Sequence, residues 1–177
     1  MRFDSTINRK QVSYLFVGYL MLDALVGNTD RHHENWGVVQ KWEWVKGASS
    51  SMTISLHTSL APTYDHASSL GREMLDERRQ RILADPAWMK RYINGGTGGI
   101  FRDAQANKGL SPLALIELVA KTYPAFFKPW QKRIVELPPN FAQPIIAPIP
   151  DACMSAASKE FALAFLNESR KLIASIP

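Results

Sequence analysis

Apolar positions in the first part of the chain follow the spacing of a helix. Between Gln11 and Val26 they recur at steps of three and four residues, which predicts a helix. Gly27 and Asn28 then mark its end, because both residue types tolerate the left-handed conformation that follows many helices. Asp23 falls on the apolar face of this helix. An unpaired carboxylate would be costly there, so we expect Asp23 to brace the neighbouring loop through hydrogen bonds.

The next part of the chain alternates in the manner of a β-hairpin. Residues 36–44 are rich in aromatic and β-branched side chains, residues 47–51 are turn formers, and residues 52–56 resume the alternation. Three tryptophans, Trp36, Trp42 and Trp44, are spaced so that they could share one face of the hairpin. Core packing is the default expectation for such a face, whereas an exposed pair would indicate a docking surface for another lobe.

The rest of the chain is predicted to be mostly helical. The expected helices are Glu73–Ala84, Pro86–Ile93, Pro112–Tyr123, Pro124–Glu136 and a last long helix from Met154 to Ile173. Three of them begin with proline, which suits the first helical position. The glycine-rich residues 94–99 are expected to form a mobile linker, and residues 137–150, with five prolines, an extended surface segment. One helix, a hairpin and further helices predict an α+β fold that is mostly α-helical.

The composition is that of one globular domain spanning residues 1–177. Hydrophobic residues make up 46% and charged residues 21%, which excludes disordered and collagen-like chains. The net charge of +5 allows an acidic partner but requires none. The lone cysteine, Cys153, excludes an intrachain disulfide and fits a reducing compartment. The sequence has no long uncharged apolar run and no clear signal peptide, so we expect a cytoplasmic protein.

Polar residues gather between the first helix and the first strand, from Gly27 to Gly37. Asp30 and Asn35 stand five residues apart there. On a helix this spacing would turn them about 140° from each other, but on a loop they can face one site. The predicted hairpin brings Asp65, which follows its second strand, back beside Asn35. Phosphoryl transfer needs an acidic residue near the attacking hydroxyl and oxygen ligands for Mg²⁺, so these three residues fit that chemistry.

Two segments carry a resemblance to a known family. An Asp and an Asn in the order Asp-x-x-x-x-Asn, followed by a short hairpin and a second Asp, are typical of protein kinases. Residues 25–39 and 60–69 together resemble the C-terminal domain of HipA-like serine/threonine kinases. The Asp-Arg-His order at residues 30–32 is distantly similar to phosphatidylinositol kinases, and the segment after Met154 looks like the family's last helix. The resemblance implies a protein-kinase-like C-lobe with a catalytic-loop hairpin near its N-terminus.

The same resemblance implies an activity and a role for each site residue. ATP would donate its γ-phosphoryl group to a serine or threonine hydroxyl of a protein substrate. Asp30 would be the catalytic base or orient that hydroxyl, and His32 would stabilise the loop or act as a second proton acceptor. Asn35 and Asp65 would hold Mg²⁺ and, through it, ATP. Ala67 stands where eukaryote-type kinases have glycine, which fits the HipA-like pattern better.

No second lobe is apparent in the sequence. Only 29 residues precede Asp30 and they are predicted to form one helix, so a strand-rich N-lobe with a phosphate-covering loop and a nucleotide-binding lysine does not fit there. We therefore expect a C-lobe without an N-lobe, which binds Mg-ATP weakly by itself. The expected partners are ATP, a protein substrate, and an N-lobe polypeptide or a HipB-like antitoxin. We expect no membrane and no direct nucleic-acid partner.

Other interpretations stay open. The kinase fold could serve as a catalytically inactive binding module that acts through a partner protein or antitoxin, or it could be a lipid or small-molecule kinase. Asp30 could be a turn residue, and Asn35 could merely cap the strand entry. The basic run at residues 78–81 is expected to be a solvated helix face rather than a contact for an acidic ligand. His66 is expected to be a structural loop residue. The two histidines at 32 and 33 are weak evidence for a zinc site.

Overall fold

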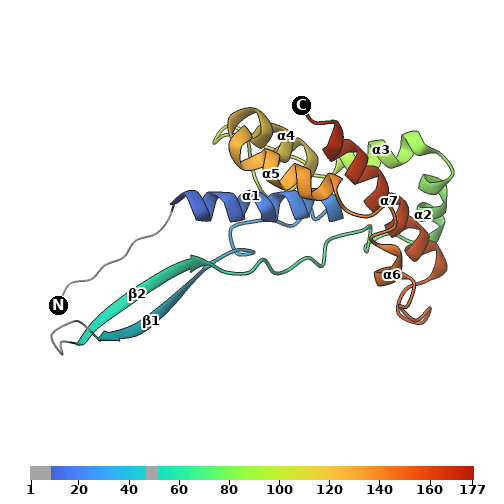
Figure 1. Cartoon of the computed structure of the whole chain (residues 1–177). Helices are drawn as coiled ribbons and strands as arrows, with labels where there is room; N and C mark the ends of the chain where they lie inside the picture. Colours follow the sequence, from blue (N-terminus) through green and yellow to red (C-terminus); the bar gives the residue numbers. More distant parts are fainter. Residues whose placement is uncertain (1–8, 47–51) are drawn as a thin grey trace.

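A helical body with a long projecting β-hairpin makes up the computed structural model, which describes residues 9–46 and 52–177 (Figure 1). The helices are α1 (Arg9–Val26), α2 (Asp76–Leu83), α3 (Pro86–Gly95), α4 (Pro112–Thr122), α5 (Pro124–Val135), α6 (Gln143–Ile146) and α7 (Ala156–Ser175). Strands β1 (Val38–Lys46) and β2 (Met52–Leu60) pair antiparallel. The predicted fold class is confirmed. No helix in the described part of the chain combines the length and apolarity needed to cross a membrane.

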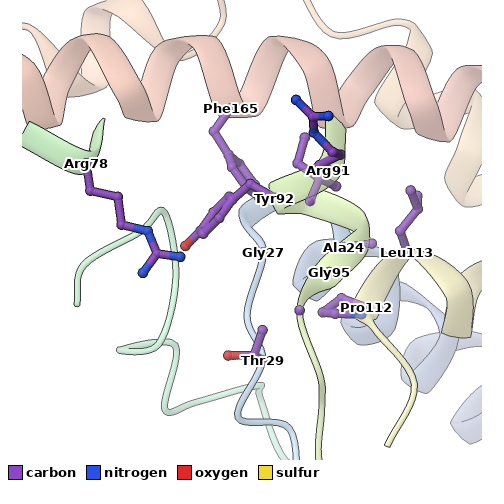
Figure 2. A pocket seen from close by; sticks show the side chains of 12 residues that line it. Ala24, Gly27, Thr29, Arg78, Arg91, Tyr92, Gly95, Pro112, Leu113 and Phe165 are labelled. Carbon is purple, nitrogen blue, oxygen red and sulfur yellow. The ribbon is translucent and has the colours of Figure 1, made fainter. Parts of the chain in front are cut away.

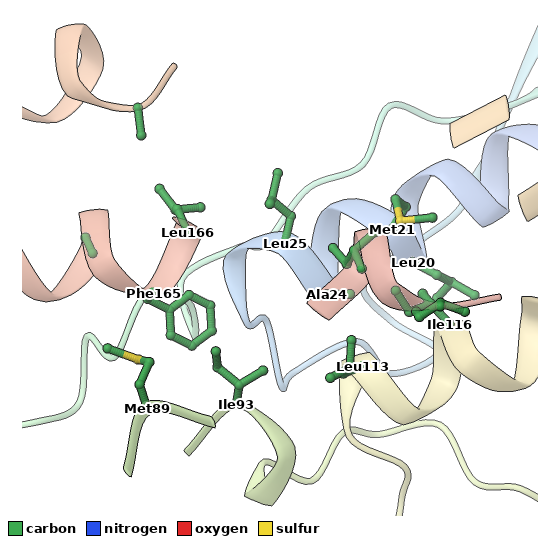
Figure 3. Packing of buried hydrophobic residues seen from close by; sticks show 14 of the residues in the cluster. Leu20, Met21, Ala24, Leu25, Met89, Ile93, Leu113, Ile116, Phe165 and Leu166 are labelled. Carbon is green, nitrogen blue, oxygen red and sulfur yellow. The ribbon is translucent and has the colours of Figure 1, made fainter. Parts of the chain in front are cut away.

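The first helix supplies the centre of the hydrophobic core. α1 packs against α4, α5 and α7. Figure 3 shows Leu20, Met21 and Ala24 of α1 beside Leu113 and Ile116 of α4. These residues are buried in one cluster with Leu25 of α1 and Phe165 of α7. Each large apolar side chain that leaves water contributes about 1.5–3 kcal/mol. This packing holds the C-terminal end of α1 in place, and the polar loop follows directly from that end.

Helices α1 and α5 approach closely at Gly18. A Cβ added there would lie 2.5 Å from the ring of Trp130, well inside van der Waals contact. The indole nitrogen of Trp130 donates a hydrogen bond of 2.8 Å to the carbonyl of Tyr14. Because the ring fills the space that a side chain at position 18 would need, glycine is required at this crossing.

The hairpin is confirmed, and its second strand is four residues longer than predicted. The register pairs Val38 with Leu60 and Trp44 with Ile54, and the predicted turn at residues 47–51 lies outside the described residues. Core packing of the tryptophans is wrong: Trp42 and Trp44 are 56% and 67% exposed. The reason is that the hairpin projects from the helical body instead of lying on it (Figure 1).

Trp36 precedes the hairpin and helps to anchor its base. Its ring meets Phe16 of α1 edge-on, with 5.5 Å between the ring centroids. The hydroxyl of Tyr19, also in α1, donates a hydrogen bond of 2.8 Å to the carbonyl of Ala61. Both ends of the hairpin are therefore attached to α1.

Most predicted helix boundaries agree with the structure to within three residues. Asp85 caps α3 by accepting a hydrogen bond from the backbone N–H of Ala87 at 2.8 Å, and a proline follows the cap. Residues 137–150 differ from the prediction, because they turn repeatedly and form the short helix α6 instead of an extended segment. A proline in the first turn of a helix loses no hydrogen bond, so Pro144 is compatible with α6, and burial of Ile146 favours it.

The basic run at residues 78–81 is only partly a solvated face. Arg78 and Arg81 are exposed, but Arg79 is buried. Its guanidinium donates to the carboxylate of Asp76 at 2.6 Å and to the carbonyl of Gly71 at 3.0 Å. The prediction is therefore wrong for Arg79, which ties the start of α2 to the preceding turn.

Candidate active site

A buried ion pair joins the end of α1 to the polar loop. The guanidinium of Arg31 donates to both carboxylate oxygens of Asp23, through Nε at 2.8 Å and Nη2 at 2.9 Å. The Arg31 and Asp23 side chains are only 4% and 3% exposed. The hydrogen bonds to Asp23 are the largest cause of the raised pKa of Arg31, and burial opposes them. The expected bracing role of Asp23 is confirmed.

Arg31 also holds two distant segments together. Its Nη1 donates to the backbone carbonyl of Asn35 and, at 3.2 Å, to the carbonyl of Tyr64. Its Nη2 donates to the hydroxyl oxygen of Thr63 at 2.9 Å. One side chain thus fixes the loop before the hairpin against the segment after it.

Two asparagines shape the loop from within. The side-chain amide of Asn28 donates to Asp23 Oδ1 at 2.9 Å, and its oxygen accepts the backbone N–H of Asp30 at 3.1 Å. The side-chain amide of Asn35 donates to the backbone carbonyl of Asp30 at 2.6 Å. Asp30 and Asn35 are therefore held at a fixed spacing. Since the Asn35 nitrogen is engaged, its amide oxygen is the atom left to bind a cation.

Asp30 and His32 reach solvent beside this loop. The Asp30 side chain is 50% exposed, and its Oδ1 lies 3.7 Å from Nε2 of His32. The other ring nitrogen of His32 lies 3.7 Å from the carboxylate of Glu34 and accepts the backbone N–H of Glu34 at 3.3 Å. The Asp30 carboxylate is accessible to solvent, and the contacts with Asp30 and Glu34 orient the His32 ring.

Asp65 lies next to the Asn35 segment. The hydroxyl of Tyr64 donates a 2.8 Å hydrogen bond to the carbonyl of Glu34, so the residues that precede Asp65 and Asn35 are directly joined. Asp65 has a φ of 56°, in the left-handed region, which aspartate tolerates better than most residues. Its side chain is exposed, and its charge is among the causes that raise the pKa of Arg31.

The segment after Asp65 runs back along the start of the polar loop. The N–H of Leu70 donates to the carbonyl of Val26 at 2.9 Å, and the N–H of Thr29 donates to the carbonyl of Ser68 at 3.4 Å. Nδ1 of His66 lies 3.4 Å from Arg31 Nη2. His66 therefore sits against the buried ion pair, as a structural loop residue would.

The glycine-rich residues after α3 pack against the same loop. A Cβ on Gly99 would lie 3.0 Å from the carbonyl oxygen of Arg31, and one on Gly96 would lie 3.0 Å from the methyl group of Thr29. The N–H of Gly98 donates to the carbonyl of Leu110 at 2.8 Å. The structure differs from the predicted mobile linker at Gly96 and Gly99, which pack closely against the polar loop.

The oxygen atoms of Asn35 and Asp65 suit Mg²⁺ that is also bound by phosphate oxygens. An amide oxygen at Asn35 and a carboxylate at Asp65 are hard oxygen ligands. Asn35 is buried, but its surroundings are polar, with the Asp30 carbonyl and the Arg31 guanidinium in contact. No group of three His, Cys, Asp or Glu side chains suited to a metal occurs within residues 9–46 and 52–177. Mg²⁺ in nucleotide sites commonly takes only about one or two carboxylates plus phosphates, which matches this set.

The sequence interpretation missed Arg31 and Asn28, the residues that organise the site. A signal for Arg31 was present, because a carboxylate on the apolar face at Asp23 needs a cationic partner within reach. Arg31 is the first basic residue after it. Nothing in the sequence singled out the side chain of Asn28 beyond its place at the end of the helix.

Comparisons with known proteins bear on the fold. No protein-family model matches this chain, and no curated protein matches its sequence. A crystal structure of a Helicobacter pylori proinflammatory kinase, CtkA, is similar with a TM-score of 0.70 at 22% sequence identity. The similarity covers 96% of this chain and 53% of that one, so this chain spans about half the length of the solved kinase. The comparison shows that the chain has a kinase-like fold.

Proposed function

We propose that this chain is the phosphotransferase lobe of a HipA-like serine/threonine kinase, which transfers the γ-phosphoryl group of ATP to a protein hydroxyl. One observation carries the proposal. The Tyr64 hydroxyl bonds to the Glu34 carbonyl at 2.8 Å, so Asp65 and Asn35 follow two directly joined residues, with Asp30 held to Asn35 by a further hydrogen bond. These contacts support a site in which two oxygen ligands and one accessible carboxylate would act together, as phosphoryl transfer requires.

Each side chain has a defined part in the proposed reaction. The carboxylate of Asp30 orients the substrate hydroxyl and accepts its proton as the hydroxyl oxygen bonds to the γ-phosphorus. The bond from that phosphorus to the β–γ bridging oxygen breaks, and ADP leaves with the electron pair. Asn35 and Asp65 would hold Mg²⁺, which when bound neutralises charge on the phosphates. His32, 3.7 Å from Asp30, would keep the loop in position or accept the proton second.

The proposed kinase also needs another polypeptide segment to cover the nucleotide. The sheet formed by residues 9–46 and 52–177 has two strands, so this part of the chain supplies no strand-rich cover for the site. A nucleotide needs such a cover for its phosphates and base. We propose that an N-lobe polypeptide supplies it and that a HipB-like antitoxin is a partner of the assembled kinase. The lone chain should then bind Mg-ATP weakly and transfer phosphate slowly.

The test uses calorimetric titration of Mg-ATP together with phosphate transfer to a serine peptide. Asp65→Asn should weaken Mg-dependent ATP binding about tenfold or more, because it removes an ionised ligand. Asp30→Asn should leave ATP binding intact and slow transfer by about 10²-fold or more, the range of a lost general base. Asp103→Asn, which neutralises an exposed carboxylate outside the site, is the matched control. Equal Mg-ATP affinity in the wild type and Asp65→Asn would refute the metal assignment.

The exposed hairpin favours a second candidate, a kinase-fold binding module without catalysis. Val38, Trp42 and Trp44 alternate on one face of β1 and are 59%, 56% and 67% exposed. This module hypothesis expects no Mg-ATP binding by the chain in the titration above. It also expects that Trp42→Ser with Trp44→Ser abolishes binding to a HipB-like partner, while the unfolding temperature stays unchanged. Phosphate transfer that depends on Asp30 would eliminate it.

A further inference from the structure

A cavity of about 270 Å³ opens beside the polar loop, between the end of α1, the start of α4, helices α2 and α3, and α7 (Figure 2). Its lining includes Arg78 and Arg91 and no acidic residue. The floor is apolar, with Ala24, Leu113 and Phe165. The cavity therefore suits a small anionic group on a short apolar stem.

Three hydrogen-bond donors face this cavity. They are the guanidinium of Arg78 and the hydroxyls of Tyr92 and Thr29 (Figure 2). Within the described residues, Arg78 forms no ion pair and neither hydroxyl is hydrogen-bonded, so all three donors are open to a ligand. Figure 2 shows the Arg78 guanidinium and the Tyr92 hydroxyl pointing toward each other. Desolvation raises the pKa of Tyr92, and the charges of Arg78 and Arg79 oppose this shift.

The donors are held in position by the surrounding packing. The Tyr92 ring packs edge-on against Phe161 and Phe165, at centroid distances of 5.6 and 6.1 Å, so its hydroxyl direction is fixed. Arg91 is less available, because it pairs with Asp85 at 3.7 Å, and Figure 2 shows its guanidinium pointing away from Thr29. Arg78 is therefore the principal cation of the cavity.

The cavity adjoins the proposed phosphate-acceptor site. Thr29 lines it and directly precedes Asp30, so the two Cα atoms are about 3.8 Å apart. We propose that this cavity is a substrate subsite that binds an acidic side chain, a carboxylate or a phosphate, next to the acceptor serine or threonine of a peptide. The role of this cavity as a substrate subsite rests on the proposed kinase function. The anion site itself rests on the Arg78, Tyr92 and Thr29 donors.

Peptide binding tests the site without requiring catalysis. The probe is a fluorescein-labelled peptide with a central serine flanked by glutamates, compared with the same peptide carrying glutamines and with one in which a phosphoserine replaces one glutamate. The glutamate peptide should bind the purified chain about tenfold more tightly than the glutamine peptide, as charge-assisted hydrogen bonds to an arginine allow. Whichever of the glutamate and phosphoserine peptides binds more tightly identifies the source of the anion. Rising salt concentration should weaken the binding of both peptides.

Variants assign the effect to the cavity. Arg78→Gln should weaken binding of the glutamate peptide about fivefold or more, and Tyr92→Phe, which keeps the ring, about threefold, since each removes one donor. Arg81→Gln makes the same charge change on the same exposed helix outside the cavity and should have less than about a twofold effect. Unfolding temperature is measured for each variant. If Arg78→Gln fails to fold, Tyr92→Phe decides the question.

The outcomes separate this inference from the proposed function. Binding of acidic peptide that depends on Arg78, without any Mg-ATP binding, supports the anion site and refutes the kinase proposal. Phosphate transfer with equal kcat/KM on glutamate and glutamine peptides supports the kinase and overturns the subsite. Equal binding of both peptides, or an Arg81→Gln effect as large as that of Arg78→Gln, also overturns it. A single-stranded oligonucleotide of equal charge that binds more tightly than the peptide would point to a different ligand and overturn it as well.

Discussion

Removal of the Arg31 side chain is the sharpest test of the site's construction. Arg31→Ala deletes both hydrogen bonds to Asp23 and those to Thr63 and Tyr64, as well as the bond to the Asn35 carbonyl. Asp23 would remain buried at the end of α1, with the Asn28 amide and the His66 ring, whose Nδ1 lies 3.7 Å from Asp23 Oδ1, as its polar neighbours. The substitution therefore leaves a carboxylate in the core without its guanidinium partner.

The expected cost follows from the burial of the pair. Both side chains are at most 4% exposed, and removing one partner of a buried ion pair costs about 3–5 kcal/mol. A domain of this size loses about 2–4 °C of melting temperature per kcal/mol, so Arg31→Ala should melt about 6–20 °C lower. Asp23 raises the pKa of Arg31, so the part of the stabilisation that depends on the arginine charge is complete below the ordinary pKa of arginine. It is lost only as the pH rises through the raised value, so the deficit should not change from neutral to moderately alkaline pH.

The assay is urea and thermal unfolding followed by far-UV circular dichroism. Lys132→Ala, which breaks an exposed ion pair with Glu136 at 3.7 Å, is the control and should change stability by about 0.5 kcal/mol or less. The double variant Asp23→Ala with Arg31→Ala should cost less than the sum of the two single variants, because it leaves no buried charge. A loss below about 1 kcal/mol for Arg31→Ala would show that water or another cation satisfies Asp23, and that the pair does not hold the loop.

Three further predictions concern the frame of the site. Gly18→Ala should destabilise the chain by about 1–3 kcal/mol, because its Cβ would overlap the Trp130 ring, and an unchanged urea midpoint would contradict this close packing. Ser111→Ala removes the N-cap of α4 and should cost about 0.5–2 kcal/mol in the same assay, whereas Ser111→Asn should largely restore stability. Hydrogen bonds from Ser155 and from Arg79 lower the pKa of Asp76, so its contribution is present above the ordinary pKa of aspartate and lost as the pH falls through the lowered value. Asp76→Asn should therefore lose less stability than the wild type on acidification, and parallel acid curves for the two proteins would contradict this.

The elements that could be predicted are those whose causes are local in sequence. The helix before Gly27 follows from apolar spacing, and α3 and α4 begin at prolines that directly follow the capping residues Asp85 and Ser111. The hairpin follows from alternation in β1 and from turn formers after it. In each case neighbouring residues determine the conformation, so sequence patterns are sufficient.

The elements that were predicted wrongly depend on what they meet in space. Gly96 and Gly99 were expected in a linker because glycine runs are flexible alone, but they lie against Thr29 and the Arg31 backbone. Residues 137–150 form a short helix because Ile146 reaches the core, which proline content does not reveal. The exposure of Trp42 likewise depends on where the hairpin projects. Tertiary contacts outweigh local preference at these positions.

The proposed metal ligands depend on the buried pair more than on their own contacts. Asp65 is exposed and its backbone is left-handed, so its place is set by the hydrogen bonds of Tyr64 to Glu34 and to Arg31. Asp65→Asn, which keeps a residue type that tolerates the left-handed backbone, should therefore lower Mg-ATP affinity and leave the unfolding temperature unchanged. Arg31→Ala should lower both, because Arg31 bonds to the backbone carbonyls of Asn35 and Tyr64 and the two segments would no longer be held together. If Arg31→Ala lowered stability but kept Mg-ATP affinity, the ligands would be positioned by the hairpin alone, and the pair would serve the fold and not the site.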